Sequence, residues 1–426
     1  MIKRILRQRW IPKRYNHIQP TPYYPKQKEI NITNDSTNEE ELNIISSSYI
    51  QPEPKPNDKI IIAMSSGVDS SVCAALYASK YPKQNITGIY MSNWSQSSSC
   101  TERDWKDVQI ICNQLGINSE RINFEFNYWD KVFNPMIENY KIGLTPNPDI
   151  SCNKFVKFGK LIDYLTEKFK NEKENWWLIT GHYARIMKLD NEFHLLRGLS
   201  TKKDQSYYLS SIPSQNLSKI ILPLGHNLKS ETRKLASHYN LHVSKKPDSQ
   251  GLCFVNPTTK KFSNFLNEYI EPNPGNIITE DGKIWGKHFG LWHGTIGQKS
   301  SISMPQGDPN YKGTWFISEK KPTTNEIVIV KGHDNPNLFK KRFKIINNDW
   351  VYDLNKIEKF KPSEIQFQYH SLSKPIGIEK IEFFENDNSF VVELVEKVRA
   401  VAPGQGGILY KGNQVLGGGM IIEAIE

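Results

Sequence analysis

A run of small and polar residues follows an apolar segment near residue 65. In the stretch IIIAMSSGVDSSV, three isoleucines lead into serines, one glycine and one aspartate, and a helical apolar pattern begins at once. The N–H groups of a helix N-terminus attract anions, serine hydroxyls add donors, and Gly67 lets the backbone approach a phosphate. The stretch predicts a phosphate-binding loop, although an ordinary serine-capped turn is the alternative. It lacks the Gly-Lys-Ser/Thr ending of a Walker A motif, so the loop itself supplies no lysine to a γ-phosphate.

Besides phosphate binding, the cysteines of the chain could support thiol chemistry. The chain has five cysteines, an odd number with no Cys-x-x-Cys pair, which argues against a disulfide framework and a zinc knuckle and favours a reducing compartment. Cys73 and Cys112 lie in amphipathic patterns and are expected in the core, while Cys100, in a serine-rich loop, receives no role. Cys152 and Cys253 are about a hundred residues apart and can meet only through the fold. Two buried structural cysteines are the alternative.

Several motifs together carry a family resemblance. SSGVDSS resembles the pyrophosphate-binding loop of the N-type ATP pyrophosphatases, which cleave ATP to AMP and pyrophosphate, with Ser66 where that motif usually has glycine. GLTPNPDISCNKFVKFG (143–159), ITGHYARI, LLRGLSTKKDQSYYLSSI and DSQGLCFV (248–255) follow in order. With them the chain resembles the tRNA-specific 2-thiouridylases from Lys59 to its C-terminus, which ends in VAPGQGGILYKGNQVLGGGMIIE. The basic leader indicates the mitochondrial branch.

The resemblance implies a chemistry in which adenylation makes the uracil 2-oxygen a good leaving group. A cysteine persulfide then delivers sulfur. Cys152 would be the nucleophile, Cys253 the persulfide carrier, and Asp149 could exchange a proton with the uracil or the thiol; the alternative for Asp149 is a turn-former after Pro148. The implied partners are the anticodon stem-loop of a tRNA and a protein that donates persulfide sulfur. A wobble uridine must leave its stack to reach such a site.

The resemblance also implies binding residues. Those for ATP are Ala63, Met64, Ser65, Ser66, Gly67, Val68, Asp69, Ser70, Met91 and Gly181. A carboxylate at Asp69 would repel phosphate unless Mg²⁺ lies between them, so magnesium is expected with the nucleotide, and no permanently bound metal is expected. Those for tRNA are Asn147, Pro148, Asp149, His182, Lys203, Asp204, Gln205, Gln368, Tyr369 and Gln405. Gln368 stands where the family usually has arginine, and Tyr369 could instead belong to a β-sheet core.

The elements that must position these residues alternate between strand and helix after Lys59. KIIIAM, NITGIYMSNW, RINFEF and WWLITGHYARI have strand patterns with helical segments between them, which predicts an α/β fold with a parallel sheet covered by helices on both faces. After about residue 260, short β-rich segments with glycine and proline take over. We therefore predict a catalytic domain over 59–261, a small central domain over 262–331 and a β-barrel-like, tRNA-binding domain over 332–426.

The N-terminal residues differ from the rest in charge. Residues 1–28 hold eight Lys or Arg and no acid, whereas residues 29–58 hold seven acids and one lysine, and the whole chain carries a net charge of +10. The first segment is typical of a mitochondrial presequence, with a disordered basic tail as the alternative, and the second of a disordered linker. No apolar run approaches the roughly 20 residues of a membrane span. We expect a matrix protein, monomeric and not bound to membranes.

Two rival functions remain at this point. One is an N-type ATP pyrophosphatase that activates a carbonyl for nitrogen transfer, as amide synthetases do; it would leave Cys152 and Cys253 idle and predicts a glutaminase domain, of which the sequence has no sign. The other is a non-catalytic RNA-binding protein with a degenerate nucleotide fold. ATP–pyrophosphate exchange would separate this second possibility from either enzyme.

Overall fold

The computed structural model describes residues 42–94, 98–173, 175–248, 262–305 and 307–425. Cys253 and the expected presequence, residues 1–28, therefore lie outside the described residues, as do the side chains of 98–100, including that of Cys100. Within the described part, no helix is both long enough and apolar enough to span a membrane.

The first region contains a five-stranded parallel sheet of order β3-β2-β1-β4-β7. Its strands are β1 (Lys59–Met64), β2 (Ile86–Ser92), β3 (Asn118–Asn123), β4 (Trp176–Ile179) and β7 (Ile220–Ile221). All four residues of β4 are buried, as expected for a strand covered on both faces. The predicted parallel sheet is confirmed.

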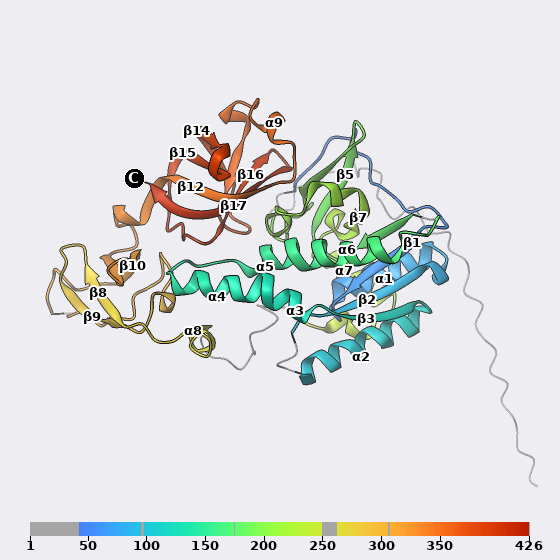
Figure 1. Ribbon diagram of the computed structural model, residues 1–426, viewed down its shortest axis with the longest axis horizontal. Coiled ribbons are helices and arrows are strands. Elements are labelled where there is room, and N and C mark those ends of the chain that lie inside the picture. Colours follow the sequence, from blue (N-terminus) through green and yellow to red (C-terminus); the bar gives the residue numbers. More distant parts are fainter. Residues whose placement is uncertain (1–41, 95–97, 174, 249–261, 306, 426) are drawn as a thin grey trace, which may run out of the picture. The chain divides into compact units, whose positions relative to one another are not determined.

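Eight helices accompany this region in the described residues: α1 (Val68–Lys80), α2 (Ser98–Leu115), α3 (Glu125–Tyr128), α4 (Asn134–Lys141), α5 (Pro148–Ser151), α6 (Leu161–Lys168), α7 (Lys229–His238) and α8 (Phe262–Leu266). A π-helical segment, Cys152–Lys160, joins α5 to α6. Successive strand residues point to opposite faces. Glu120 of β3 accepts a hydrogen bond from Tyr164 of α6, and Arg121 donates one to Glu102 of α2. Helices α6 and α2 therefore cover opposite faces of the sheet (Figure 1).

The third strand differs from its prediction. RINFEF was expected to be extended, but β3 covers Asn118–Asn123 and a helix begins at Glu125. The side-chain oxygen of Asn123 accepts a hydrogen bond from the Glu125 N–H at 2.8 Å, a local turn that stops the strand.

The expected disordered linker is wrong for its second half. Leu42 pairs with Ser200 and Ile50 with Lys188 in antiparallel bridges, next to the hairpin of β5 (Ala184–Leu189) and β6 (Glu192–Arg197). The segment ends at Asp58, which is buried and accepts a hydrogen bond from the Trp177 indole at 2.8 Å. Residues 42–58 thus satisfy backbone groups at a sheet edge, and their polar composition does not show this.

The later regions are β-rich, as predicted. A four-stranded sheet of order β10-β11-β8-β9 comprises β8 (Gly275–Thr279), β9 (Ile284–His288), β10 (Trp315–Lys321) and β11 (Glu326–Lys331). It is followed by β12 (Phe339–Trp350), the short helix α9 (Leu354–Ile357), β13 (Gln366–Gln368), β14 (Ile376–Phe384), β15 (Ser389–Arg399), β16 (Gly406–Lys411) and β17 (Gln414–Ile425).

The last six strands form a closed barrel. Strand β12 pairs with both β15 and β17, which closes the order β12-β15-β14-β13-β16-β17. Aromatic and branched side chains such as Phe343, Phe367 and Phe390 fill it. Strand β17 also pairs with β6 of the first region, so the barrel and the β5–β6 hairpin share one hydrogen-bonded sheet.

Candidate active site

The phosphate-binding loop lies at the carboxyl end of β1 and leads into α1, where ligands of parallel α/β sheets bind. Gly67 is the N-cap residue of α1 and no side chain caps this end, which leaves the first N–H groups of the helix to an anion. The Ser70 hydroxyl accepts a hydrogen bond from the Ser65 N–H at 3.1 Å and donates to the Gly67 carbonyl at 3.3 Å, so the loop is folded by its own serines. Met91 is half-buried near the end of the neighbouring strand, β2.

Ser66 adopts the left-handed conformation, with φ +57°. This explains why the family motif has glycine there, because a Cβ atom is strained in that region. Its hydroxyl donates to Asp104 Oδ1 at 2.8 Å and accepts from the Lys246 ammonium at 2.9 Å. Lys246 also contacts Asp107 at 3.0 Å. Serine thus fits the loop with two hydrogen bonds that a glycine could not make.

Gly181, which the resemblance places next to the nucleotide, lies close to the first turn of α1. A Cβ atom on Gly181 would lie 2.9 Å from the carbonyl carbon of Asp69 and from the backbone nitrogen of Ser70. Any side chain there would push the loop away. The next residue, His182, contacts the other candidate site, as described below.

Asp69 has a different environment from the one predicted. Lys229, at the start of α7, places its ammonium 2.6 and 2.8 Å from the two carboxylate oxygens of Asp69, and the Tyr183 hydroxyl donates to the same carboxylate at 2.9 Å. The argument that required Mg²⁺ to shield Asp69 is therefore wrong, because Lys229 already compensates its charge. Among the described residues no group of three or more His, Cys, Asp or Glu side chains could hold a metal ion.

Lys229 also joins a second carboxylate. Asp248 lies 3.0 Å from Lys229, 2.9 Å from Lys203 and 2.6 Å from Arg233. Burial opposes ionisation of Asp248, but the hydrogen bonds and charges of Lys203 and Lys229 outweigh it and lower its pKa to about 2. The sequence analysis missed Lys229 and Lys246. The missing Walker lysine indicated that a cation must come from elsewhere, but no pattern showed from where.

The cysteine motif forms a second site. Asn147 is the N-cap residue of α5, and its side-chain oxygen accepts from the Asp149 N–H at 3.1 Å. Pro148 is buried, Asp149 is exposed, and Cys152, buried at 6% exposure, begins the π-helical segment. Although the Asp149 residue is exposed overall, the protein around its carboxyl partly desolvates it and raises its pKa, while the charge of Lys157 opposes the rise.

His182 connects the two sites. Its imidazole lies 5.5 Å from the Phe158 ring of the π-helical segment, and its Nδ1 is 2.7 Å from the Thr180 hydroxyl. Burial, with the charge of Lys157, lowers the pKa of His182 to about 3, so the ring is neutral at physiological pH. The turn Gly181–His182 therefore touches the phosphate loop through one residue and the Cys152 segment through the next.

Cys73 and Cys112 are fully buried, as predicted for core residues. Burial raises the pKa of the Cys112 thiol to about 11 and raises that of Cys73 as well, which keeps both unreactive.

Several expected tRNA contacts have internal partners instead. Gln368 is 1% exposed and accepts a hydrogen bond from Arg197 at 2.8 Å, and Asp204, 5% exposed, pairs with the same guanidinium at 3.1 Å. The expectation that Gln368 and Asp204 touch tRNA therefore disagrees with the structure, because the buried cation of Arg197 needs both as acceptors. Gln205 accepts from the Tyr183 N–H at 2.9 Å, and Lys203 of the same trio is only partly exposed.

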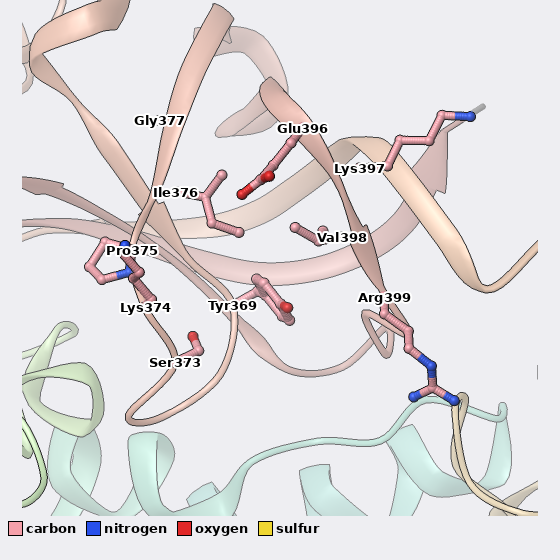
Figure 2. Close-up of a pocket in the computed structure, with 10 residues that line it drawn as sticks. All are labelled: Tyr369, Ser373, Lys374, Pro375, Ile376, Gly377, Glu396, Lys397, Val398 and Arg399. Carbon is pink, nitrogen blue, oxygen red and sulfur yellow. The ribbon is translucent and has the colours of Figure 1, made fainter. Parts of the chain in front are cut away.

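Tyr369 borders a hollow of about 430 Å³ on the barrel. Figure 2 shows the residues around it, which are Tyr369, Ser373, Lys374, Pro375, Ile376, Gly377, Glu396, Lys397, Val398 and Arg399. Tyr369 packs partly on the barrel core, so both of its predicted roles fit its position. The set combines the Tyr369 ring with basic side chains and the acidic Glu396, and Lys397 and Arg399 point to the other side of β15 from Glu396 and Val398 (Figure 2).

Comparison with known proteins decides the family. The chain matches the family models described as tRNA methyl transferase HUP domain over residues 58–257, tRNA methyl transferase PRC-barrel domain over 263–331 and aminomethyltransferase beta-barrel domain over 340–421. It is 48% identical over 406 residues to the mitochondrial tRNA-specific 2-thiouridylase 1 of Saccharomyces cerevisiae, covering 89% of this chain and 96% of that one. This chain belongs to the tRNA-specific 2-thiouridylase family.

A bacterial relative supports the same family assignment. The tRNA-specific 2-thiouridylase MnmA of Lactiplantibacillus plantarum is 37% identical over 370 residues, covering 86% of this chain and 95% of that one. Among solved structures, the U34-tRNA thiolase NcsA from Methanococcus maripaludis matches 46% of this chain and 62% of its own with 20% identity and a TM-score of 0.29, too slight a similarity for a functional conclusion. The resemblance inferred from the motifs is confirmed, and thiolation is favoured over the amide-synthetase alternative.

Proposed function

We propose that this protein is an ATP-dependent tRNA-uridine 2-sulfurtransferase that thiolates the wobble uridine of mitochondrial tRNAs. Besides family membership, the observation that carries the proposal is the turn Gly181–His182. It contacts the phosphate loop at Asp69–Ser70 and the Cys152 segment at Phe158. A nucleotide above the first site and a base beside the second would meet over this turn.

The N-terminus of α1 and the loop hydroxyls bind the ATP phosphates in this proposal. Lys229 and Lys246 flank the loop and supply the positive charge that its own sequence lacks. Each lysine is already paired with carboxylates, so further charge compensation is needed for the polyphosphate. We propose that ATP binds together with Mg²⁺, which would supply this further charge compensation.

In the proposed reaction the uracil 2-oxygen attacks the α-phosphate and pyrophosphate leaves. The terminal sulfur of a persulfide on Cys253 then attacks carbon 2, and AMP departs with the oxygen. Finally the Cys152 thiolate attacks the Cys253 sulfur and breaks the sulfur–sulfur bond, which releases the 2-thiouridine and leaves a Cys152–Cys253 disulfide. A thiol reductant supplies two electrons to restore both thiols, and a donor protein reloads Cys253. In this proposal Asp149, whose carboxyl has a raised pKa, exchanges a proton with the base or the thiol.

For tRNA, we propose that Asn147, Pro148 and Asp149 meet the target base and that Lys203, His182 and Gln405 lie along the bound RNA. The hollow beside Tyr369 would take part of the anticodon stem-loop (Figure 2). Because phosphate contacts release counterions, tRNA affinity should fall steeply with salt.

The two cysteines provide the decisive experiment. Cys253→Ser should release pyrophosphate in the presence of tRNA but form no thiouridine, because it cannot carry a terminal sulfur. Cys152→Ser should accept labelled sulfur on Cys253 and then stall. Oxidised wild-type protein should contain a Cys152–Cys253 disulfide, which requires Cα atoms within roughly 7 Å.

Peptide mapping shows which cysteine carries the labelled sulfur, and mass spectrometry of the tRNA shows whether thiouridine has formed. Label on Cys152 in place of Cys253 would reverse the two roles. Normal thiolation by either serine variant would end the two-cysteine mechanism, and absence of ATP–pyrophosphate exchange with tRNA in the wild type would favour the non-catalytic alternative.

We also propose that the protein acts in the mitochondrial matrix as a monomer and that residues 1–28 are its import signal. Deletion of 1–28 should leave the activity of the purified protein intact and abolish import. Deletion through Asp58 should instead destabilise it, because residues 42–58 pair with the β5–β6 hairpin. Loss of activity in the shorter deletion would count against the presequence.

A further inference from the structure

The segment that leads into the cysteine site is held from two other regions of the chain. After α4 ends, the backbone turns at Gly143, with φ +88°, and continues through Thr145 to the cap residue Asn147 of α5. Since α5 runs directly into Cys152, whatever fixes the backbone of Gly143–Thr145 also fixes the approach to Asp149 and Cys152.

Barrel residues hold this segment from one side. The Thr145 N–H donates to the Pro403 carbonyl at 2.7 Å, and the Gln405 side-chain amide donates to the Thr145 carbonyl at 2.6 Å. Gly404 lies so close that a Cβ atom there would be 2.5 Å from the Thr145 nitrogen. Both backbone polar groups of Thr145 are thus bound by the barrel.

Lys320 holds it from the other side. This residue lies on β10 of the four-stranded sheet, and its ammonium donates to the Gly143 carbonyl at 2.9 Å and lies 3.5 Å from the Thr145 hydroxyl. Leu291 of the same region packs on Gly143, where a Cβ atom would be 3.0 Å from Leu291 Cδ1.

The environment of Lys320 differs from that of an ordinary surface lysine. Burial lowers its pKa to about 8, and its charge is directed at a buried backbone carbonyl with no carboxylate among its described hydrogen-bond and ion-pair partners. An apolar side chain at this position would leave the buried Gly143 carbonyl without this donor, so the contact depends on the ammonium group.

We propose that Lys320 is a positioning residue for thiolation: its ammonium, opposite Gln405, fixes the Gly143–Thr145 backbone and thereby sets the position of Asp149 and Cys152. The proposal rests on the proposed function for its activity readout only, because the position of Cys152 can be measured without tRNA.

The test compares Lys320→Met with Lys320→Arg, which keeps a cationic donor, and with Lys321→Met on the same strand, whose side chain faces the opposite side. Iodoacetamide labelling is quantified separately at Cys152, Cys73 and Cys112 by peptide mass spectrometry on the full chain. In Lys320→Met we expect labelling of Cys152 to be at least fivefold faster, with Cys73 and Cys112 unchanged. We expect kcat for thiolation to fall about tenfold, the usual scale for losing one charged hydrogen bond, with the KM for ATP within twofold of wild type. Lys320→Arg should recover part of both effects.

Unchanged labelling of Cys152 in Lys320→Met would overturn the proposal. So would equal acceleration at all three cysteines, since that reports general unfolding, or the same changes in Lys321→Met. If the wild type forms no thiouridine, the proposed function fails, while the labelling still decides whether Lys320 positions the Cys152 segment.

Discussion

The phosphate loop and the Gly143–Cys152 segment are built in opposite ways. The loop is folded by its own neighbours, since Ser65, Gly67 and Ser70 bind one another within six residues. The Gly143–Cys152 segment has few such contacts and is held by Lys320 from one region and Gln405 from another. The backbone of the phosphate loop can therefore form within one βα unit, although its neighbouring cations come from distant residues, whereas the backbone that leads to Cys152 is held by two other regions.

The largest expected loss of activity comes from removing a lysine that contacts the phosphate loop from elsewhere in the chain. Lys229→Met removes the ammonium beside Asp69 and leaves Asp69 without this counter-charge, so tRNA-dependent pyrophosphate release should fall about 100-fold, as when one preorganised charge-stabilising group is lost. Affinity for tRNA, measured by filter binding, should stay within threefold. Lys234→Met, an exposed position on the same helix, is the control. Undiminished pyrophosphate release would show that the loop functions without Lys229.

Gly404→Ala tests the assembled site. The new Cβ atom would lie 2.5 Å from the Thr145 nitrogen and force the segment to move, so thiolation should drop at least tenfold. Gly412→Ala is a matched control, because Gly412 also has a positive φ, +55°, but no heavy atom lies within 4 Å of its added Cβ. Both variants carry backbone strain of about 1 kcal/mol or more. Equal activities of the two would mean that the contact with Thr145 does not matter to catalysis.

Variants of Ser66 test how much the contacts of the phosphate loop contribute to stability. Ser66→Ala keeps the strained left-handed backbone and loses both hydrogen bonds, so it should lower the free energy of unfolding by about 1–2 kcal/mol. Ser66→Gly loses the same bonds but relieves the strain, and should be about 1 kcal/mol more stable than the alanine variant. Urea denaturation measures both. If the alanine variant is the more stable of the two, the left-handed backbone at residue 66 does not cost the protein measurable stability.

The smallest effect is a pH dependence at the turn between the two sites. The pKa of His182 in the folded protein is lowered from 6.5 to about 3. Between these two pH values the unfolded chain is protonated at His182 while the folded protein is not. Stability from this group is complete above pH 6.5 and is lost as pH falls toward 3. His182→Gln should have a shallower loss of Tm between pH 6.5 and 4.5 than wild type. Desolvation likewise lowers the pKa of His226 to about 3, so His226 contributes in the same direction and remains in both proteins.

Much of the fold could be predicted because its signals are local. The buried strands of the parallel sheet, the helix after the phosphate loop and the β-rich C-terminal half all followed from residue periodicity, and the roles expected for Cys152 and Asp149 followed from the family resemblance of their motifs. The part of the fold that was misjudged most depends on distant pairing. Residues 42–58 have the composition of a linker, yet they pair with a sheet edge more than a hundred residues away.

The sequence alone determined which groups are available for chemistry: the serine-rich loop, Asp149, Cys152 and the family to which they belong. The tertiary structure decided their surroundings. It paired Asp69 with Lys229, 160 residues away, and so removed the reason to place a metal on that carboxylate. It buried Gln368 against Arg197 and brought Lys320 to Gly143. Charge compensation and burial depend on distances in space, which spacing along a chain does not encode once contacts reach beyond one βα unit.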